Sequence, residues 1–297
     1  MSVVLITGAS TGIGNLTARA LAEAGHTVYA SMRGINHRNA DHAREMLDIA
    51  ARDDVDLRVV ELDVQSQDSV DQAVKTVLDE AGHLDVVVHN AGHMSIGYTE
   101  AFTVEELAHQ FDINAFSVQR VNRAVLPHMR ERRSGTLLYV GSTTTVSVPP
   151  FLGPYVASKF AFDALAQVTA YEVSQFGIET VIVMPGAFTR GTNHFPNASL
   201  ASDQAIAAAY AALDPMVERY GAATEGLFAP GVDPDPRTVA DEIARLLALP
   251  VGAKPLRSVI DFTGSNVEEV NATNLASSAD FLARMGFGEL LRVKTKS

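Results

Sequence analysis

The stretch Thr7-Gly8-Ala9-Ser10-Thr11-Gly12-Ile13-Gly14 lies between the apolar run Val3–Thr7 and a helical pattern over Leu16–Ala24. A glycine-rich turn between a strand and a helix lets the backbone approach a pyrophosphate, and the helix N-terminus supplies free N–H groups and a positive dipole end. The spacing is G-x-x-x-G-x-G rather than G-x-G-x-x-G. We therefore predict a dinucleotide site that includes Gly8, Ser10, Thr11, Gly12, Ile13 and Gly14.

Short apolar runs alternate with helical patterns along the whole chain. The expected strands are Val3–Thr7, Thr27–Ser31, Leu57–Leu62, Leu84–His89, Thr136–Val140, Ile178–Met184 and Val259–Phe262. The expected helices are Leu16–Ala24, Ala40–Ala51, Ser69–Glu80, a broken Val104–Arg132, Tyr155–Phe176 and Arg237–Leu249. Near-continuous apolar strands that alternate with helices are typical of a parallel sheet covered on both faces. The pattern predicts an α/β fold: a Rossmann-type, doubly wound parallel sheet in three α/β/α layers.

The domain organisation follows from the same pattern. A length of 297 residues suggests about two domains, but neither a linker nor an internal repeat divides the chain. We predict a single domain over 1–297. Residues 187–236, rich in alanine, glycine and proline with a helical patch at Ala201–Ala212, are expected to form a substrate lid. Residues 267–291 are expected to form a helical tail.

Composition excludes several function classes. The 23 basic and 35 acidic residues give a net charge of −12, which argues against a nucleic-acid partner. The absence of cysteine excludes disulfides and thiolate chemistry, and no H-E-x-x-H or similar motif predicts a metal site. The charge-free stretch Gly135–Ser158 contains three prolines, so it reads as strand, loop and helix start rather than a membrane span. We expect a cytoplasmic protein with a small-molecule partner and no membrane partner.

The end of the second expected strand indicates which dinucleotide binds. It reads Ala30-Ser31-Met32-Arg33, and no acidic residue lies between Glu23 and Asp41. An acid about 20 residues after the glycine turn would accept a hydrogen bond from the ribose 2′-OH, whereas arginine pairs with a 2′-phosphate. Arg33, assisted by Arg38, therefore predicts NADP(H) in preference to NAD(H).

Beyond the glycine turn, an ordered set of motifs resembles the short-chain dehydrogenase/reductase family over Val3 to about Thr189. The set comprises Thr7-Gly8-x-x-x-Gly12-x-Gly14, Asp63, Asn90-Ala91-Gly92, Asn114, Ser142, Tyr155-x-x-x-Lys159 and Pro185-Gly186. Any one of these is weak evidence, but the full ordered set is specific. The resemblance implies a carbonyl reductase-like member that prefers NADP.

The residues themselves support the chemistry that this resemblance implies. Tyr155 and Lys159 are four residues apart and share one face of a helix. A lysine ammonium favours the phenolate, so we expect the pKa of Tyr155 to lie below its usual value of about 10 and its hydroxyl to exchange a proton with a substrate oxygen. Ser142 follows a strand, where its hydroxyl would polarise a substrate carbonyl.

The resemblance assigns further roles. It implies that Lys159 and Tyr155 also contact the cofactor and that Asn114 helps to hold a water molecule beside the lysine. Asp63 and Val64 would lie at the adenine, Asn90, Ala91 and Gly92 along the cofactor, and Pro185, Gly186 and Thr189 at the nicotinamide end. The family often has asparagine at the position of His89. Each residue also has a structural alternative, such as a loop hydroxyl for Ser142, a helix cap for Asp63 or a solvated Arg33.

The substrate and the assembly are predicted only as classes. Apolar residues around the expected site (Met94, Val146, Val148, Phe151, Leu152, Phe188 and Phe195) predict an apolar pocket, with Met94, Ser142, Phe151, Tyr155 and Phe188 contacting the substrate. We expect a lipophilic ketone or secondary alcohol: a 3-oxoacyl, steroid-like, quinone, aliphatic or aryl compound. The alternatives are a redox-neutral isomerase, epimerase or dehydratase on the same fold, and a nucleotide-sensing protein without turnover. The resemblance also implies a homodimer or homotetramer paired through the helices at 104–132 and 155–176.

Overall fold

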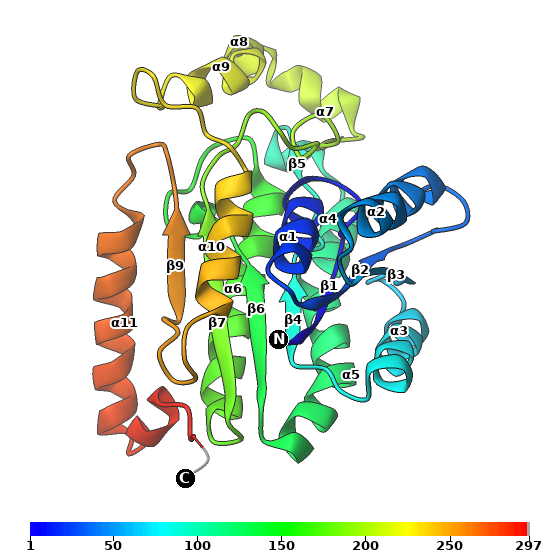
Figure 1. Ribbon diagram of the computed structural model, residues 1–297. Coiled ribbons are helices and arrows are strands. Elements are labelled where there is room, and N and C mark those ends of the chain that lie inside the picture. The colour runs from blue at the N-terminus through cyan, green and yellow to red at the C-terminus, as the bar shows by residue number, and fades with distance from the viewer. Residues whose placement is uncertain (296–297) are drawn as a thin grey trace.

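A single seven-stranded parallel sheet organises the computed structural model, which describes residues 1–295 (Figure 1). The strand order is β3-β2-β1-β4-β6-β7-β9. The bounds are β1 (Val3–Ile6), β2 (Thr27–Met32), β3 (Leu57–Glu61), β4 (Val86–His89), β6 (Gly135–Val140), β7 (Ile178–Pro185) and β9 (Arg257–Ile260). The chain order reverses between β1 and β4, which is where such sheets open a crevice for a ligand. The predicted doubly wound sheet is confirmed.

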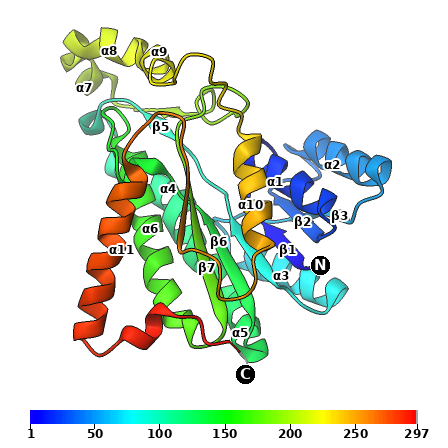
Figure 2. The same cartoon turned by 60° about the vertical axis from the view of Figure 1, so that its left-hand side comes forward.

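Helices cover both faces of the sheet (Figure 2). One face carries α1 (Gly12–Glu23), α2 (Ala40–Asp53) and α10 (Arg237–Leu247), and the other carries α3 (Gln67–Ala81), α5 (Ser117–Arg132) and α6 (Gly153–Ser174). Within β1, Val4 and Ile6 pack into the core on the side of α1, α2 and α10, whereas Leu5 packs into the core on the side of α3, α5 and α6. The strands are buried on both sides, and this explains why they read as continuous apolar runs. The three-layer prediction is confirmed.

The predicted break within 104–132 is a widened helical turn. α4 (Val104–Phe111) runs through a π-helical turn, Asp112–Phe116, into α5. α4 begins with a capping box, in which Thr103 Oγ1 accepts from Glu106 N at 3.2 Å and Glu106 Oε2 accepts from Thr103 N at 2.8 Å. The chain therefore continues as a helix, with one wider turn that carries Asn114.

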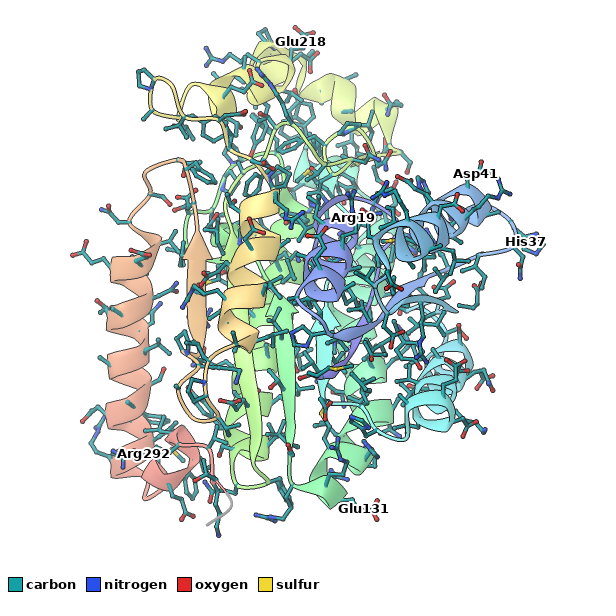
Figure 3. All side chains as sticks on the ribbon, in the orientation of Figure 1. Arg19, His37, Asp41, Glu131, Glu218 and Arg292 are labelled. Carbon is teal, nitrogen blue, oxygen red and sulfur yellow. The ribbon has the colours of Figure 1, made fainter. Side chains whose placement is uncertain are left out.

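Residues 187–236 lie across the carboxyl edge of the sheet (Figure 1). The segment contains β8 (Ser199–Leu200), α7 (Gln204–Ala209), α8 (Asp214–Glu218) and α9 (Tyr220–Glu225). β8 pairs in parallel with β5 (Ser95–Ile96), which ties the segment to the loop after β4. Glu218 projects from its outer side (Figure 3). The helix expected over Ala201–Ala212 is shorter, because Asp203 Oδ1 caps it by accepting from Ile206 N at 3.0 Å and a 3₁₀ turn follows at Ala211–Leu213.

The C-terminal region lies beside the edge strand β9. That strand begins two residues before the expected Val259, at Arg257. The expected tail is α11 (Val267–Arg284), followed by a short 3₁₀ turn at Gly288–Leu291. Among residues 1–295, none of the helices combines the length and apolar character needed to cross a membrane.

Candidate active site

The glycine turn after β1 is shaped by its backbone. Gly8 and Gly12 have positive φ angles of 68° and 59°, a region that side chains disfavour. A Cβ at Gly14 would lie 2.3 Å from Asn90 Nδ2. α1 begins at Gly12, and its N-cap Thr11 makes no side-chain capping bond. The first N–H groups of a helix have no partner within the helix, so those of α1 remain available to a ligand.

Asn90, directly after β4, holds this turn in place. Its Nδ2 donates to Thr7 O at 2.9 Å and to Gly8 O at 3.0 Å. In return Thr7 Oγ1 accepts from the backbone N–H groups of Asn90 and Ala91, each at 3.0 Å. The ends of β1 and β4 are therefore fastened together at the point where the strand order reverses.

A cavity of about 1090 Å³ runs along this edge of the sheet. Most of the residues predicted for the site line it: Gly8, Ser10, Thr11, Gly12, Ile13, Gly14, Arg33, Arg38, Asp63, Val64, Asn90, Ala91, Gly92, Met94, Ser142, Tyr155, Lys159, Pro185, Gly186 and Phe188. Asn114, Phe151 and Thr189 do not line it, nor does Val146. The glycine turn and the Ser142–Tyr155–Lys159 group thus share one cavity.

Arg33 and Arg38 stand at the outer end of the cavity. Arg33 is exposed, and its Nη1 donates to Gln65 Oε1 at 3.5 Å. The carboxylate of Glu61 accepts from Gly34 N at 2.6 Å and from Ile35 N at 2.9 Å. His37, farther along the same loop, projects away from the sheet (Figure 3). The acid at the end of β3 is therefore engaged by the loop backbone, and the two arginines face the cavity.

Asp63 and its neighbours form a turn on the cavity wall. Asp63 Oδ1 accepts from Gln65 N at 3.0 Å, and Asp63 N donates to Ser69 Oγ at 2.9 Å. The N-cap of α3 is Ser66, whose hydroxyl accepts from Ser69 N at 3.3 Å. Asp63 therefore shapes the loop without capping the helix, and it remains on the cavity wall.

Tyr155 and Lys159 lie on the first two turns of α6. Pro154, which suits the first turn of a helix, stands just before Tyr155. Both are buried. Lys159 Nζ donates to Val140 O at 3.0 Å and lies 4.7 Å from the centroid of the Phe162 ring. Burial lowers the pKa of Lys159 to about 8 and raises the pKa of Tyr155 to about 12. The predicted lowering of the Tyr155 pKa is wrong for the protein without cofactor, because burial disfavours the charged phenolate more than its neighbours stabilise it.

Ser142 follows β6 and caps the 3₁₀ turn Thr143–Thr145. Its Oγ accepts from Thr144 N at 3.2 Å and from Thr144 Oγ1 at 2.9 Å. A hydrogen bond between the Ser142 and Tyr155 side chains favours the phenolate and partly offsets the effect of burial on the Tyr155 pKa. Ser142 therefore has the structural role of a loop hydroxyl and also reaches Tyr155.

Asn114 lies behind the cavity wall and links three segments. Its Oδ1 accepts from His93 N at 2.8 Å, and its Nδ2 donates to His93 O and to Ser158 Oγ, both at 2.9 Å. Ser158 Oγ in turn donates to Tyr155 O at 2.7 Å. The π-helical turn thus connects the loop after β4 to the first turn of α6.

Residues that sequence reasoning missed come from the segment 187–236. Asn193, His194, Asn197, Tyr220 and Thr224 line the cavity together with apolar residues. The wall near Tyr155 is therefore more polar than predicted. The segment has no sheet or long-helix periodicity, so no pattern indicated which of its side chains turn inward.

Phe151 is the clearest departure from the predicted substrate residues. Its φ is +64°, and its carbonyl accepts from Gly97 N at 2.8 Å. The ring packs against Tyr98 and Tyr220, with centroid distances of 5.9 and 6.5 Å. Phe151 therefore supports the aromatic cluster behind Tyr220 and does not line the cavity.

Comparison with known proteins agrees with this geometry. A family model described as short chain dehydrogenase matches residues 2–200. The chain belongs to the short-chain dehydrogenase/reductase family. It is 36% identical over 189 residues to a 3-ketodihydrosphingosine reductase of Bacteroides thetaiotaomicron, covering 64% of this chain and 65% of that protein. It is 35% identical over 188 residues to human retinol dehydrogenase 8, covering 62% and 58%.

Solved structures of the same fold extend the likeness. A short-chain dehydrogenase from Streptomyces avermitilis has a TM-score of 0.71 at 29% identity and covers 95% of both chains. An alcohol dehydrogenase from Thermococcus sibiricus, complexed with 5-hydroxy-NADP, has a TM-score of 0.70 at 25% identity and covers 90% of this chain and 98% of that one. The stretch shared with the two curated relatives named above is less than two thirds of their length.

The residues of this short-chain dehydrogenase fit a bound dinucleotide. A Cβ at Gly12 would meet only Thr192, at 3.7 Å, so the glycine leaves open space beside the helix N-terminus.

His89, where the family often has asparagine, belongs to the core: its ring stacks on Tyr139 with centroids 4.4 Å apart. Within residues 1–295, no three side chains of the metal-binding types cluster closely enough to hold a metal ion.

Proposed function

We propose that this short-chain dehydrogenase is an NADP(H)-dependent oxidoreductase that interconverts a ketone and a secondary alcohol. The observation that carries the proposal is that Ser142, Tyr155 and Lys159 share one cavity with the glycine turn. This arrangement brings a proton donor and a carbonyl-polarising hydroxyl next to a site suited to a dinucleotide. Family membership supports the same reaction class.

Bound NADPH would supply the hydride for reduction, and bound NADP⁺ would accept it in the reverse direction. On the protein side, the N–H groups at the start of α1 bind pyrophosphate oxygens. Asp63 and Val64 would hold the adenine, and Gly92 and Pro185-Gly186 would hold the nicotinamide end. Thr189 would assist there from just outside the cavity lining. Arg33 and Arg38 bind the 2′-phosphate.

Proton transfer is assigned to Tyr155. Its hydroxyl donates a proton to the substrate oxygen during reduction and takes one back during oxidation, while the Ser142 hydroxyl hydrogen-bonds the same oxygen. Burial holds the pKa of Tyr155 at about 12 in the protein without cofactor. At neutral pH its hydroxyl is therefore protonated and can act as the donor. Lys159, fixed by the Val140 carbonyl, would place a cation beside the ribose of the bound cofactor.

The positioning role is assigned to Asn114. Its amide bridges the His93 backbone and Ser158, and Ser158 bonds to the Tyr155 carbonyl. We propose that this bridge keeps Tyr155 aligned with the loop after β4, and that water near Lys159 uses the same polar region to deliver protons.

The substrate is proposed to be a lipophilic ketone. Met94, Val148, Leu152, Phe188 and Phe195 line the cavity, and residues 187–236 cover this part of it as a lid. Ketone-containing and alcohol-containing lipids are also named in the two curated relatives, 3-ketodihydrosphingosine and retinol. The lid would exclude water from the reacting carbon.

The test is a carbonyl panel assayed for NADPH oxidation, with the alcohol product quantified. The proposal expects one alcohol formed for each NADPH consumed, and slower turnover with NADH. Product formation without net consumption of NADPH would instead support a redox-neutral isomerase or dehydratase. Binding of NADPH with no turnover of any carbonyl would support a sensing protein.

A further inference from the structure

His194, from the segment 187–236, lies directly against Tyr155. The two rings meet edge to face, with centroids 5.5 Å apart and planes inclined by 69°. Both side chains line the cavity. The segment therefore brings an imidazole to the place where a substrate oxygen bonded to Tyr155 would lie.

Tyr220, at the start of α9, approaches the same place from farther along the segment. It packs on the small apolar cluster that contains Met94, Leu152 and Tyr155, and it also lines the cavity. In agreement with this packing, a negative charge on Tyr220 would raise the pKa of Tyr155. Tyr155 thus has two polar neighbours from the segment.

The other polar rings of this region are already engaged. The Tyr98 hydroxyl donates to Asp214 Oδ1 at 2.6 Å, the Tyr210 hydroxyl donates to Glu100 Oε2 at 2.6 Å, and His93 Nε2 lies 2.6 Å from Ser199 Oγ. Among residues 1–295, by contrast, no hydrogen bond is found for the imidazole of His194 or the hydroxyl of Tyr220. Both residues are half-buried and line the cavity, so their unpaired polar atoms are open to a ligand in it.

We infer that His194 and Tyr220 bind a second oxygen of the substrate, a hydroxyl on a carbon next to the reacting carbonyl. This inference rests on the proposed function and narrows its substrate class to vicinal hydroxy ketones and the corresponding diols. A hydroxyl fits because a neutral imidazole and a phenol can each donate and accept one hydrogen bond. The adjacent carbon fits because His194 contacts the ring whose hydroxyl holds the carbonyl oxygen.

The electrostatics of the site favour a neutral partner group. Burial, together with smaller effects of the nearby Lys159 and His93, lowers the pKa of His194 to about 4. His194 is therefore an uncharged imidazole at neutral pH. The groups that face it are Tyr155, Lys159 and His93, together with Tyr220 on the cavity wall, and none of them is a carboxylate.

The experiment compares three ketones of equal chain length: octan-2-one, 1-hydroxyoctan-2-one and 3-hydroxyoctan-2-one. The value of kcat/KM with NADPH is measured for the wild type, His194→Phe and Tyr220→Phe. The first variant keeps a ring against Tyr155 without its nitrogens, and the second removes one oxygen. Tyr210→Phe is the matched control, because it makes the same change in the same segment outside the cavity lining.

The wild type is expected to prefer at least one hydroxy ketone over octan-2-one by about tenfold, the worth of one hydrogen bond of about 1.4 kcal/mol. Each of the two variants should reduce that preference several-fold, whereas Tyr210→Phe should keep it. NADPH affinity and thermal melting verify that each variant is folded.

The inference is overturned if the wild type shows no preference, or if both variants lower kcat/KM for all three ketones by the same factor. The second result would assign the pair to packing alone. A folded wild type that binds NADPH and oxidises it with none of the three ketones would instead contradict the proposed function, so the two failures are distinguishable.

Discussion

We propose that the choice of cofactor depends on Arg33. It lines the cavity beyond β2, and the neighbouring acid Glu61 is held by backbone N–H groups. Arg33→Ala should weaken NADPH binding about 10- to 100-fold, because a hydrogen bond to a charged group contributes about 1.5–3 kcal/mol. NADH affinity should change little. Arg44→Ala is the control, since Arg44 pairs with Asp41 on the exposed surface of α2. Titration by cofactor fluorescence gives the affinities, and an equal loss for both cofactors would contradict the assignment.

His89 makes the stability of the fold depend on pH. It is buried against Tyr139, its Nε2 has no hydrogen-bond partner, and burial lowers its pKa to about 3. In the unfolded chain His89 has a pKa near 6.5, so between pH 6.5 and 3 it is protonated in the unfolded chain and neutral in the folded one. The stability contributed by neutral His89 is therefore full above pH 6.5 and is lost as the pH falls toward 3, at about 1.4 kcal/mol per unit.

His89→Phe should keep the stacked ring and remove this dependence. Denaturant unfolding at pH 7 and pH 5 measures it: the variant should lose about 2 kcal/mol less than the wild type over that interval. His37→Phe is the control, because His37 is exposed and projects into solvent (Figure 3). Equal losses in wild type and His89→Phe would show that other groups control the acid limb.

At single positions, the sequence identifies types of chemistry better than it identifies environments. The spacing of Tyr155 and Lys159 predicted a shared helix face, but the pKa of Tyr155 depends on burial, which a four-residue spacing does not encode. The ring of Phe151 turns away because its backbone adopts a positive φ and bonds to Gly97. His194 and Tyr220 reach the cavity only through the tertiary path of their segment.

We propose that the cofactor site depends on the junction of β1 and α1. Gly12 and Gly82 both have positive φ, 59° and 74°, and neither has an atom closer than 3.4 Å to an added Cβ. Gly12→Ala and Gly82→Ala should therefore each cost about 1–2 kcal/mol of folding stability through backbone strain. Only Gly12 lines the cavity, so only Gly12→Ala should weaken NADPH binding, by tenfold or more.

Thermal melting and NADPH titration of both variants separate the two effects. Similar melting with a cofactor defect confined to Gly12→Ala would support the assignment. An unchanged NADPH affinity for Gly12→Ala would place the cofactor elsewhere.

The elements of the sheet could be predicted because each strand is buried on both faces and reads as an apolar run between helical patterns. The ends were less accessible. β9 begins at Arg257, and its polar start offers no apolar signal. For the π-helical turn, the sequence predicted only a break in the helix. Its residues fit a helical pattern, and that pattern does not distinguish a wider turn from an ordinary one. β5 and β8 are two-residue strands, too short to show an alternation.

At the scale of the whole molecule, we propose a homodimer that pairs through exposed apolar side chains on α4 to α6. Val104, Phe116, Phe160 and Val168 are 76%, 51%, 45% and 52% exposed. Such a surface is costly in a monomer and suits a self-complementary contact. Val168→Glu should convert the proposed dimer into a monomer, because a charge would be buried at the contact.

Sedimentation velocity measures the assembly. Val251→Glu is the control, because Val251 is 62% exposed and lies in the turn after α10, outside the helices proposed to pair. A wild type that sediments as a monomer at micromolar concentration would contradict the dimer. A tetramer that persists in Val168→Glu would place the main contact on another face.

The overall architecture was the most predictable level, because strand order and handedness follow from general rules once the alternation of elements is recognised. The sequence predicted that the segment 187–236 is an insertion over the site, but it did not predict the helices and contacts within it. Its helices are held by contacts between distant parts of the chain, such as Tyr98 with Asp214 and Tyr210 with Glu100. The polar character that it gives the cavity follows from those contacts.

The central claim is that Tyr155 exchanges the proton in a reaction driven by NADPH. The most direct test compares kcat for ketone reduction in the wild type, Tyr155→Phe and Tyr171→Phe. Tyr171 lies on the same helix, where its hydroxyl accepts from Gln167 Nε2 at 2.7 Å, and it is outside the cavity lining. We predict a loss of about 100- to 10,000-fold for Tyr155→Phe, with NADPH affinity retained, and wild-type turnover for Tyr171→Phe. Undiminished ketone reduction by Tyr155→Phe would contradict the account.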